Sequence, residues 1–136
     1  MTKRIPTIHI CSFSYHASGI PADPTGHGGG FVFDCRFLPN PGREERYREM
    51  TGRDAEVAAY LEAREEARTF RERVLRMVED AVEGVRAKGY EDITVCFGCT
   101  GGRHRSVFFA EELHKHLAAR GERCDLTHRD LPGEEG

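Results

Sequence analysis

The sequence of 136 residues lacks any apolar run that approaches the roughly 18–20 residues of a membrane span. It also lacks an excess of positive charge, because 20 Lys and Arg residues stand against 23 Asp and Glu residues and the formal net charge is -3. These two absences exclude a transmembrane protein and the global positive field that draws many proteins to nucleic acid. Any contact with RNA would therefore have to be local.

A repeated Cys-x-x-Cys pair is also missing. Five cysteines are present, but only Cys96 and Cys99 have this spacing, and no second pair accompanies them. The absence of a second pair argues against a structural zinc site, and we expect no metal and no other cofactor. The odd number of cysteines, without a secretory segment of basic start and apolar middle, predicts a protein of the reducing cytoplasm.

A single domain over residues 1–136 is expected, since domains usually contain about 100–150 residues. The apolar content of 38% suffices for one modest core. Ten of the 15 glycines fall within residues 19–52 and 98–102, beside apolar patterns, and so they mark loops and not general disorder. Residues 132–136 are predicted to form a flexible tail.

Hydrophobic periodicity predicts four strands and three helices in the order β-β-α-α-β-α-β. The strands are expected at residues 5–14, 31–37, 93–97 and 123–128, and the helical segments at residues 54–88, with a break near 65–69, and from the 98–106 loop to about 120. This order predicts an α/β fold with a small, mostly parallel sheet of about four strands flanked by helices. Asp34 and Arg36 are expected on one face of the second strand, since strand side chains repeat every two residues.

The segment 15–30 is rich in Gly, Pro, Ser, His and Asp and is too long for a simple connection. It is either a functional lid or a disordered tip. His16 and His27 lie in it and are candidates for ligand contact, the alternative being exposed loop histidines.

The glycine-rich segment 98–106 links the third predicted strand to a helix, and such a turn binds anions because backbone N–H groups converge at the helix N-terminus. Arg103, His104 and Arg105 stand at the beginning of this helix, where the helix dipole disfavours cations. A bound phosphate or carboxylate would compensate for them, and the Thr100 and Ser106 hydroxyls would add donors. The Walker A pattern is absent, which argues against ATP or GTP hydrolysis of that type.

A second interpretation of the same loop is enzymatic. Cys99, Arg105 and Ser106 have the C-x5-R-[ST] spacing of cysteine-dependent phosphatases, in which a thiolate attacks phosphorus while Arg and loop amides hold the oxygens. Gly98 stands where those enzymes usually have His. The candidate acids are Asp34 and Asp130.

Four blocks of the sequence resemble the C-terminal domain of the RNase adapter RapZ family. They occur in family order at residues 33–41, 50–52, 98–107 and 128–131, and include FDCRFLPNP and GCTGGRHRSV. The resemblance covers nearly the whole chain. It implies an α/β domain that senses a phosphorylated amino sugar, glucosamine-6-phosphate, and that in full-length members takes part in presenting small RNAs to a ribonuclease.

Two family features are not found in this sequence. The ATPase domain with its Walker motif is missing, so a homo-oligomer or a separate ATPase is the expected protein partner. The basic RNA-binding tail is missing as well, and the sequence ends in PGEEG, which would repel a phosphate backbone.

The resemblance and the loop together suggest a ligand pocket for a phosphosugar or for inorganic phosphate or sulfate. Asp34 would accept hydrogen bonds from a sugar hydroxyl or amine, Arg36 and Arg105 would hold the phosphate, and Arg129 would close the pocket. His104 has three open roles: a donor to the anion, an acid or base, or a cap of the loop. The candidate ligand-binding residues are Asp34, Arg36, Cys99, Thr100, Gly101, Gly102, His104, Arg105, Ser106 and Arg129.

Overall fold

The computed structural model describes residues 5–23 and 30–132. All of the predicted flexible tail except Pro132 lies outside these residues, as does His27. No helix in the described part of the chain is long and apolar enough to cross a membrane.

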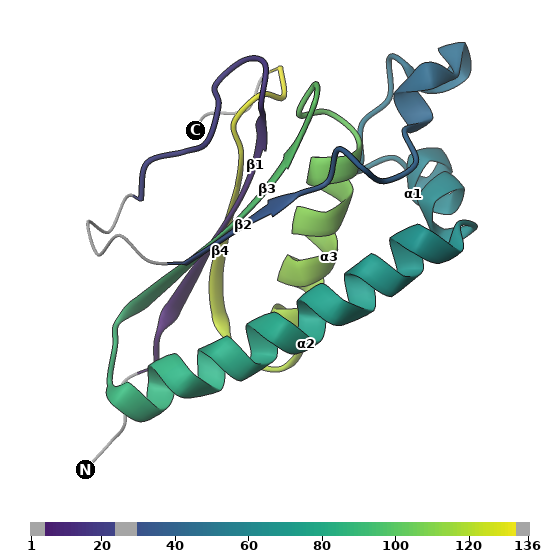
Figure 1. Ribbon diagram of the computed structural model, residues 1–136. Coiled ribbons are helices and arrows are strands. Elements are labelled where there is room, and N and C mark those ends of the chain that lie inside the picture. The colour runs from purple at the N-terminus through teal and green to yellow at the C-terminus, as the bar shows by residue number, and fades with distance from the viewer. Residues whose placement is uncertain (1–4, 24–29, 133–136) are drawn as a thin grey trace.

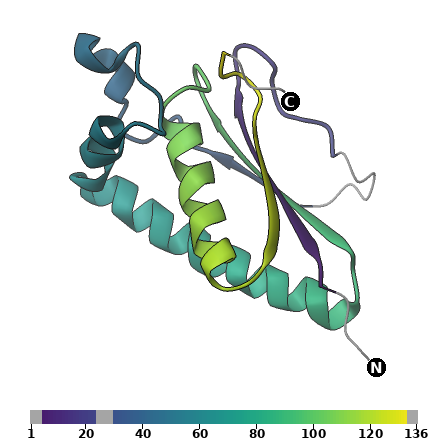
Figure 2. The same ribbon diagram turned by 180° about the vertical axis from the view of Figure 1, so that it is seen from behind.

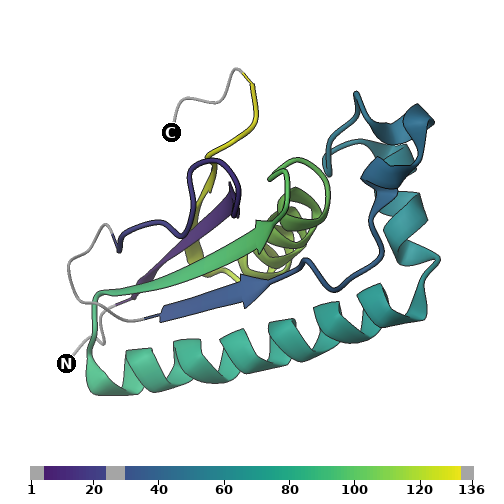
Figure 3. The ribbon, with the colours of Figure 1, turned by 45° about the horizontal axis from the view of Figure 1, so that its top comes forward.

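Four parallel strands form the sheet and are arranged in the order β2-β3-β1-β4 (Figure 1). Their bounds are Thr7–Ser14 for β1, Gly30–Asp34 for β2, Asp92–Cys99 for β3 and Arg123–His128 for β4. All strand pairs are parallel, so every carboxyl end lies at the same edge of the sheet, as the arrowheads in Figure 3 show. The predicted α/β fold with a parallel sheet is confirmed.

Three α-helices accompany the sheet: α1 at Ala55–Glu62, α2 at Glu65–Lys88 and α3 at Arg105–Ala119. Two short 3-10 helices, Pro41–Arg43 and Glu45–Tyr47, precede α1. The helices α2 and α3 lie on one side of the sheet, and α3 packs on β1, β3 and β4 (Figure 2).

The core lies between this helix pair and one face of the sheet. Alternate residues of the strands, such as Ile8 and Ile10 on β1 and Val95 and Phe97 on β3, are at most 1% exposed and face the helices. The helices contribute an apolar stripe at helical spacing, which on α2 comprises Val74, Val78 and Val82. The structure is therefore a two-layer α/β domain, and no helix within residues 5–23 and 30–132 covers the second face of the sheet.

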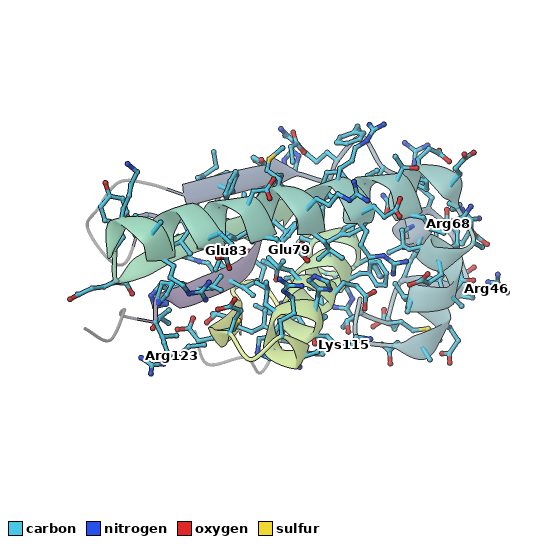
Figure 4. All side chains as sticks on the ribbon, turned by 90° about the horizontal axis from the view of Figure 1, so that it is seen from below. Arg46, Arg68, Glu79, Glu83, Lys115 and Arg123 are labelled. Carbon is cyan, nitrogen blue, oxygen red and sulfur yellow. The ribbon has the colours of Figure 1, made fainter. Side chains whose placement is uncertain are left out.

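The outer side of α2 is charged. Figure 4 shows Glu79 and Glu83 on α2 and Lys115 on α3, among many other charged side chains. The Glu79 carboxylate and the His116 ring are hydrogen-bond partners, and this contact links α2 to α3. Gly89 ends α2 in a left-handed conformation.

The second strand was predicted to extend to Phe37, but β2 ends at Asp34. The Asp34 carboxylate accepts a hydrogen bond from the Arg36 N–H at 2.9 Å, and this local turn replaces the strand ladder. Asp34 and Arg36 thus do not share a strand face, and the turn brings their side chains together instead.

Other boundaries also differ from the prediction. The strand β1 begins at Thr7 and not at residue 5, and β3 extends to Cys99 because Gly98 and Cys99 still accept hydrogen bonds from Cys35 and Tyr15. The helical break lies at residues 63–64, before the predicted 65–69. The Arg64 guanidinium closes α1 there, since it donates to the Tyr60 carbonyl.

Candidate functional site

The loops that follow the strands meet at the carboxyl edge of the sheet, and Ser14 joins three of them. Its hydroxyl donates to the Thr100 carbonyl at 2.6 Å, and its backbone N–H donates to the Asp130 carboxylate at 2.7 Å. The same hydroxyl accepts hydrogen bonds from the N–H groups of His16 and Ala17. Ser14 is not among the site residues predicted from the sequence, although its place at the end of a strand that leads to this edge was a usable signal.

The loop between β3 and α3 passes very close to this serine. Gly102 has φ 66°, and a Cβ atom there would lie 2.9 Å from the Ser14 nitrogen. Within the described residues, the backbone N–H groups of Gly101, Gly102 and Arg103 donate to no other group. The loop therefore offers free donors at the N-terminus of α3, as an anion site requires.

Arg105 begins α3 and is only 4% exposed. Its Nη1 donates to the carbonyls of Arg36 and Leu38 at 2.9 and 3.0 Å, while Nη2 lies 3.5 Å from the Thr100 hydroxyl. Its Nε is the one buried side-chain nitrogen or oxygen in the described part of the chain that has no hydrogen-bond partner. Arg105 thus places a buried positive charge at the loop, with no carboxylate bound to it among the described residues.

Asp34 and Arg36 form a half-exposed pair beside this charge. The Arg36 guanidinium donates to both carboxylate oxygens of Asp34, with Nε 3.0 Å from Oδ1 and Nη2 2.8 Å from Oδ2, and it lies 3.7 Å from the centre of the Tyr15 ring. The hydrogen bond from Arg36 lowers the pKa of Asp34, so the carboxylate is charged at neutral pH. The structure therefore brings together a carboxylate, a guanidinium and an aromatic ring next to Arg105.

The side chains of Arg103 and His104, which precede Arg105, point away from the loop. Arg103 donates to the carbonyls of Glu49 and Met50, and the His104 imidazole is 2.8 Å from the Tyr47 carbonyl. Burial lowers the pKa of His104, so the ring is neutral and donates to Tyr47. Of the three roles left open for His104, this geometry matches the cap of the loop.

Cys99 lies at the base of the loop and is 2% exposed within the hydrophobic core. Its thiol donates to the Ser106 hydroxyl at 3.1 Å, and the Ser106 N–H donates to the sulfur at 3.4 Å. Asp130, one of the candidate acids, accepts hydrogen bonds from Ser14 and Ser18. This arrangement holds the loop together and leaves the sulfur buried.

The remaining predicted residues are dispersed around the edge. Thr100 and Gly101 are exposed on the loop, and His16 is exposed after β1. Arg129 lines a cavity on the helix-free face of the sheet, together with Cys11, Cys96 and Thr127. No group of three or more His, Cys, Asp or Glu side chains in the described residues is arranged to hold a metal ion.

The carboxyl edge of this parallel α/β domain thus combines a glycine-rich loop, backbone N–H groups without a partner among the described residues, and the buried Arg105 cation. The profile of the RapZ C-terminal domain matches residues 6–132, and the chain belongs to this family.

Similar curated proteins carry the name nucleotide-binding protein. One from Acidobacterium capsulatum is 41% identical over 125 residues, which cover 92% of this chain and 39% of that protein. One from Ruegeria sp. (strain TM1040) is 41% identical over 128 residues, covering 94% of this chain and 41% of that protein, and one from Lactobacillus acidophilus is 38% identical over 130 residues, with 95% and 42% covered. The chain thus spans about two-fifths of the length of these relatives.

Proposed function

We propose that this domain is a binding or sensor module for a phosphorylated small metabolite, a phosphosugar such as glucosamine-6-phosphate, held at the loop between β3 and α3. The observation that carries the proposal is the buried Arg105 guanidinium with its unpartnered Nε. A buried charge without a counter-ion is costly, and a phosphate at the loop would offset that cost. The free N–H groups of the loop and the exposed Thr100 hydroxyl supply further donors for phosphate oxygens.

The sugar part of the ligand is assigned to Asp34 and its surroundings. Its carboxylate is charged, half-exposed and close to Arg105, and it is suited to accept hydrogen bonds from hydroxyl or amine groups. The adjacent Tyr15 ring, with Arg36 stacked on it, forms a wall of the proposed pocket. An amino sugar phosphate combines the anion and the donors that these residues require.

The names of the relatives are compatible with this ligand class, because nucleotides are also phosphorylated small molecules. The present chain aligns with only about two-fifths of those proteins and has no Walker A pattern. We therefore place the phosphosugar, and not ATP, in this pocket. A cytoplasmic location and a separate ATPase or second copy as partner remain part of the proposal.

Isothermal titration calorimetry of the purified chain tests the proposal. Glucosamine-6-phosphate is expected to bind, and glucosamine without the phosphate is expected to bind at least about ten-fold more weakly, since charge-assisted hydrogen bonds contribute about 1.5–3 kcal/mol each. Arg36→Gln and Thr100→Val should weaken binding, while Arg123→Gln, which removes an exposed arginine from β4 near the opposite edge, should not. Equal binding by all three variants, or no heat with any phosphorylated compound, contradicts the proposal.

The phosphatase interpretation is disfavoured by the burial of Cys99. A thiol that is 2% exposed and bonded to Ser106 is not open to in-line attack on a phosphorus atom. We expect no turnover of an aryl phosphate. Turnover that is abolished by Cys99→Ser would favour the enzyme over the binding module.

A further inference from the structure

A cavity of about 640 Å³ opens on the face of the sheet that no helix of the described residues covers. Its floor consists of two rows of register partners on β3, β1 and β4: Thr94, His9 and Asp125, then Cys96, Cys11 and Thr127. Arg129 lines the cavity beyond the second row, since its N–H donates to the Ser12 carbonyl and continues the ladder of β4. Pro21 and Ala22 form a wall. The volume lies within the range of about 300–1,000 Å³ that is typical of small-molecule sites.

The two ends of this cavity carry opposite charges. The Arg129 side chain is exposed and forms no hydrogen bond or ion pair within residues 5–23 and 30–132. At the other end, Oδ2 of Asp125 lies 2.7 Å from Nδ1 of His9, whereas Oδ1 has no partner in the described part of the chain. The Thr127 hydroxyl between them also forms no hydrogen bond with a described residue. The cavity therefore offers a guanidinium, a hydroxyl and a carboxylate oxygen along one strand.

The spacing of the two charges limits the length of a ligand that could contact both. Asp125 and Arg129 are separated by four steps of extended chain, which corresponds to about 13 Å between their Cα atoms. The side chains of both residues extend into the cavity and shorten this distance. A fully extended peptide spans at most about 3.6 Å per residue, so two or three residues reach about 7–11 Å. A peptide of this length matches the gap between the charged groups.

We propose that this cavity binds a short unmodified peptide of two or three residues, with its carboxylate on Arg129 and its ammonium group on Asp125. The guanidinium fork is suited to bind a carboxylate, and the second oxygen of Asp125 accepts hydrogen bonds from an ammonium group. The Thr127 hydroxyl is placed to bond a peptide group between the ends. The thiols of Cys11 and Cys96 form an uncharged floor for small side chains.

Other simple ligand classes use only part of this site. An anion such as inorganic phosphate would bind Arg129 but would leave the carboxylate of Asp125 without a partner and be repelled by it. A cation would have the reverse conflict. His9 does not remove the need for a ligand, because its two ring nitrogens contact only Oδ2 of Asp125 and the carboxylate of Asp92. The inference is independent of the proposed phosphosugar site, which uses the loop between β3 and α3 and other side chains.

The test is a titration of the isotope-labelled full chain with trialanine, followed by amide NMR spectra. Trialanine is expected to bind and to shift the amide signals of Cys96 and Thr127. N-acetyl-trialanine lacks the ammonium group, and trialanine amide lacks the carboxylate. Each should bind at least about five-fold more weakly than trialanine, because each loses a charge-assisted hydrogen bond to a partly exposed group.

Substitutions at the two ends identify which peptide group each residue binds. Arg129→Gln should remove the preference for a free carboxylate and keep the preference for a free ammonium group, whereas Asp125→Asn should do the reverse. Arg123→Gln is the matched control, because it removes an exposed arginine of β4 that does not line the cavity. Thr100→Val, a change in the proposed phosphosugar site, should also leave trialanine binding unchanged.

The dispersion of each amide spectrum verifies that the variant is folded, and the three peptides can be compared on the unaltered chain without any variant. Equal affinity for trialanine, its acetylated form and its amide overturns the inference. So does the absence of a saturable shift at millimolar trialanine, or a shift confined to the 98–106 loop. A loss of binding in Arg123→Gln as large as that in Arg129→Gln also contradicts it.

Discussion

Arg103, His104 and Arg105 follow one another at the start of α3, yet their side chains bind backbone carbonyls of different segments. Arg103 and His104 hold residues 47–50, while Arg105 holds residues 36 and 38. Three residues that can carry a positive charge at the start of a helix predict an anion site, but Arg103 and the neutral His104 fix the surrounding loops instead. Only Arg105 remains close to the free N–H groups of the loop, and this residue carries the functional proposal.

Gly102 sets the path of the same loop, and its replacement by alanine should destabilise the fold. Its left-handed backbone costs a residue with a Cβ atom about 1–2 kcal/mol, and the new atom would collide with Ser14 and Asp130. We expect Gly102→Ala to lower the free energy of unfolding in urea by about 2 kcal/mol or more. Gly101→Ala is the matched control, because a Cβ atom at Gly101 meets nothing within 4 Å. Equal stability of the two variants would show that the loop can shift freely.

At the level of strands and helices, the periodicity of apolar residues predicts every strand and α-helix, because the same alternation that buries one face of β1 or one stripe of α2 is visible in the sequence. The errors in the prediction lie at the ends of strands and helices, because side-chain hydrogen bonds determine where an element ends. The Asp34 carboxylate accepts a hydrogen bond from the Arg36 N–H, and β2 ends there, earlier than predicted. The Arg64 guanidinium donates to the Tyr60 carbonyl, and the helical break lies before the predicted position. Hydrogen bonds of this kind between side chains and the nearby backbone leave no periodic pattern in the sequence. The two 3-10 helices before α1 were missed for the same reason.

His9 links three strands and should make stability depend on pH. It lies on β1 between Asp92 of β3 and Asp125 of β4, at 2.6 and 2.7 Å. Although burial acts to lower the pKa of His9, its hydrogen bonds to Asp92 and Asp125 raise it above the ordinary 6.5. The protonated ring is therefore more stable in the folded state, and its contribution is complete below pH 6.5 and is lost as the pH rises through the raised pKa.

Urea unfolding of His9→Gln at several pH values measures this contribution. The free energy of unfolding of the variant should be about 1 kcal/mol lower than that of the unaltered chain near pH 6, and the difference should be clearly smaller near pH 9. The value at pH 6 is small because Asp125 is exposed to solvent. His114→Gln serves as the control, because His114 forms no ion pair within residues 5–23 and 30–132. A loss for His9→Gln that is constant with pH, or that grows as the pH rises, would contradict the assignment of a charged ring.

For the molecule as a whole, the parallel topology explains which parts of the site were predictable. Because all strands run the same way, the segments after β2 and β3 must meet at one edge, and so the shared position of Asp34 and the 98–106 loop at that edge was predictable from the sequence. The positions of side chains at that edge were not predictable. Ser14 connects the loops after β3 and β4 through its hydrogen bonds to Thr100 and Asp130. Arg129 lines the cavity on the other face of the sheet.

The charge of the whole molecule leads to the last prediction, which concerns RNA. With a formal net charge of -3, the chain should not retard a labelled hairpin RNA in a mobility-shift assay at about 200 mM salt, since binding to a phosphate backbone depends on neutralising cations. Substituting Lys for the exposed Glu45, Glu49 and Glu72 changes the charge by six, to +3, and provides a matched positive control. Binding of that variant is expected to retard the RNA at about 50 mM salt, and the fraction of bound RNA should fall steeply as the salt concentration rises. Retardation by the unaltered chain with a similarly steep salt dependence would mean that a local group of cations binds RNA despite the overall charge. The adapter role would then take precedence over the binding of a small metabolite alone.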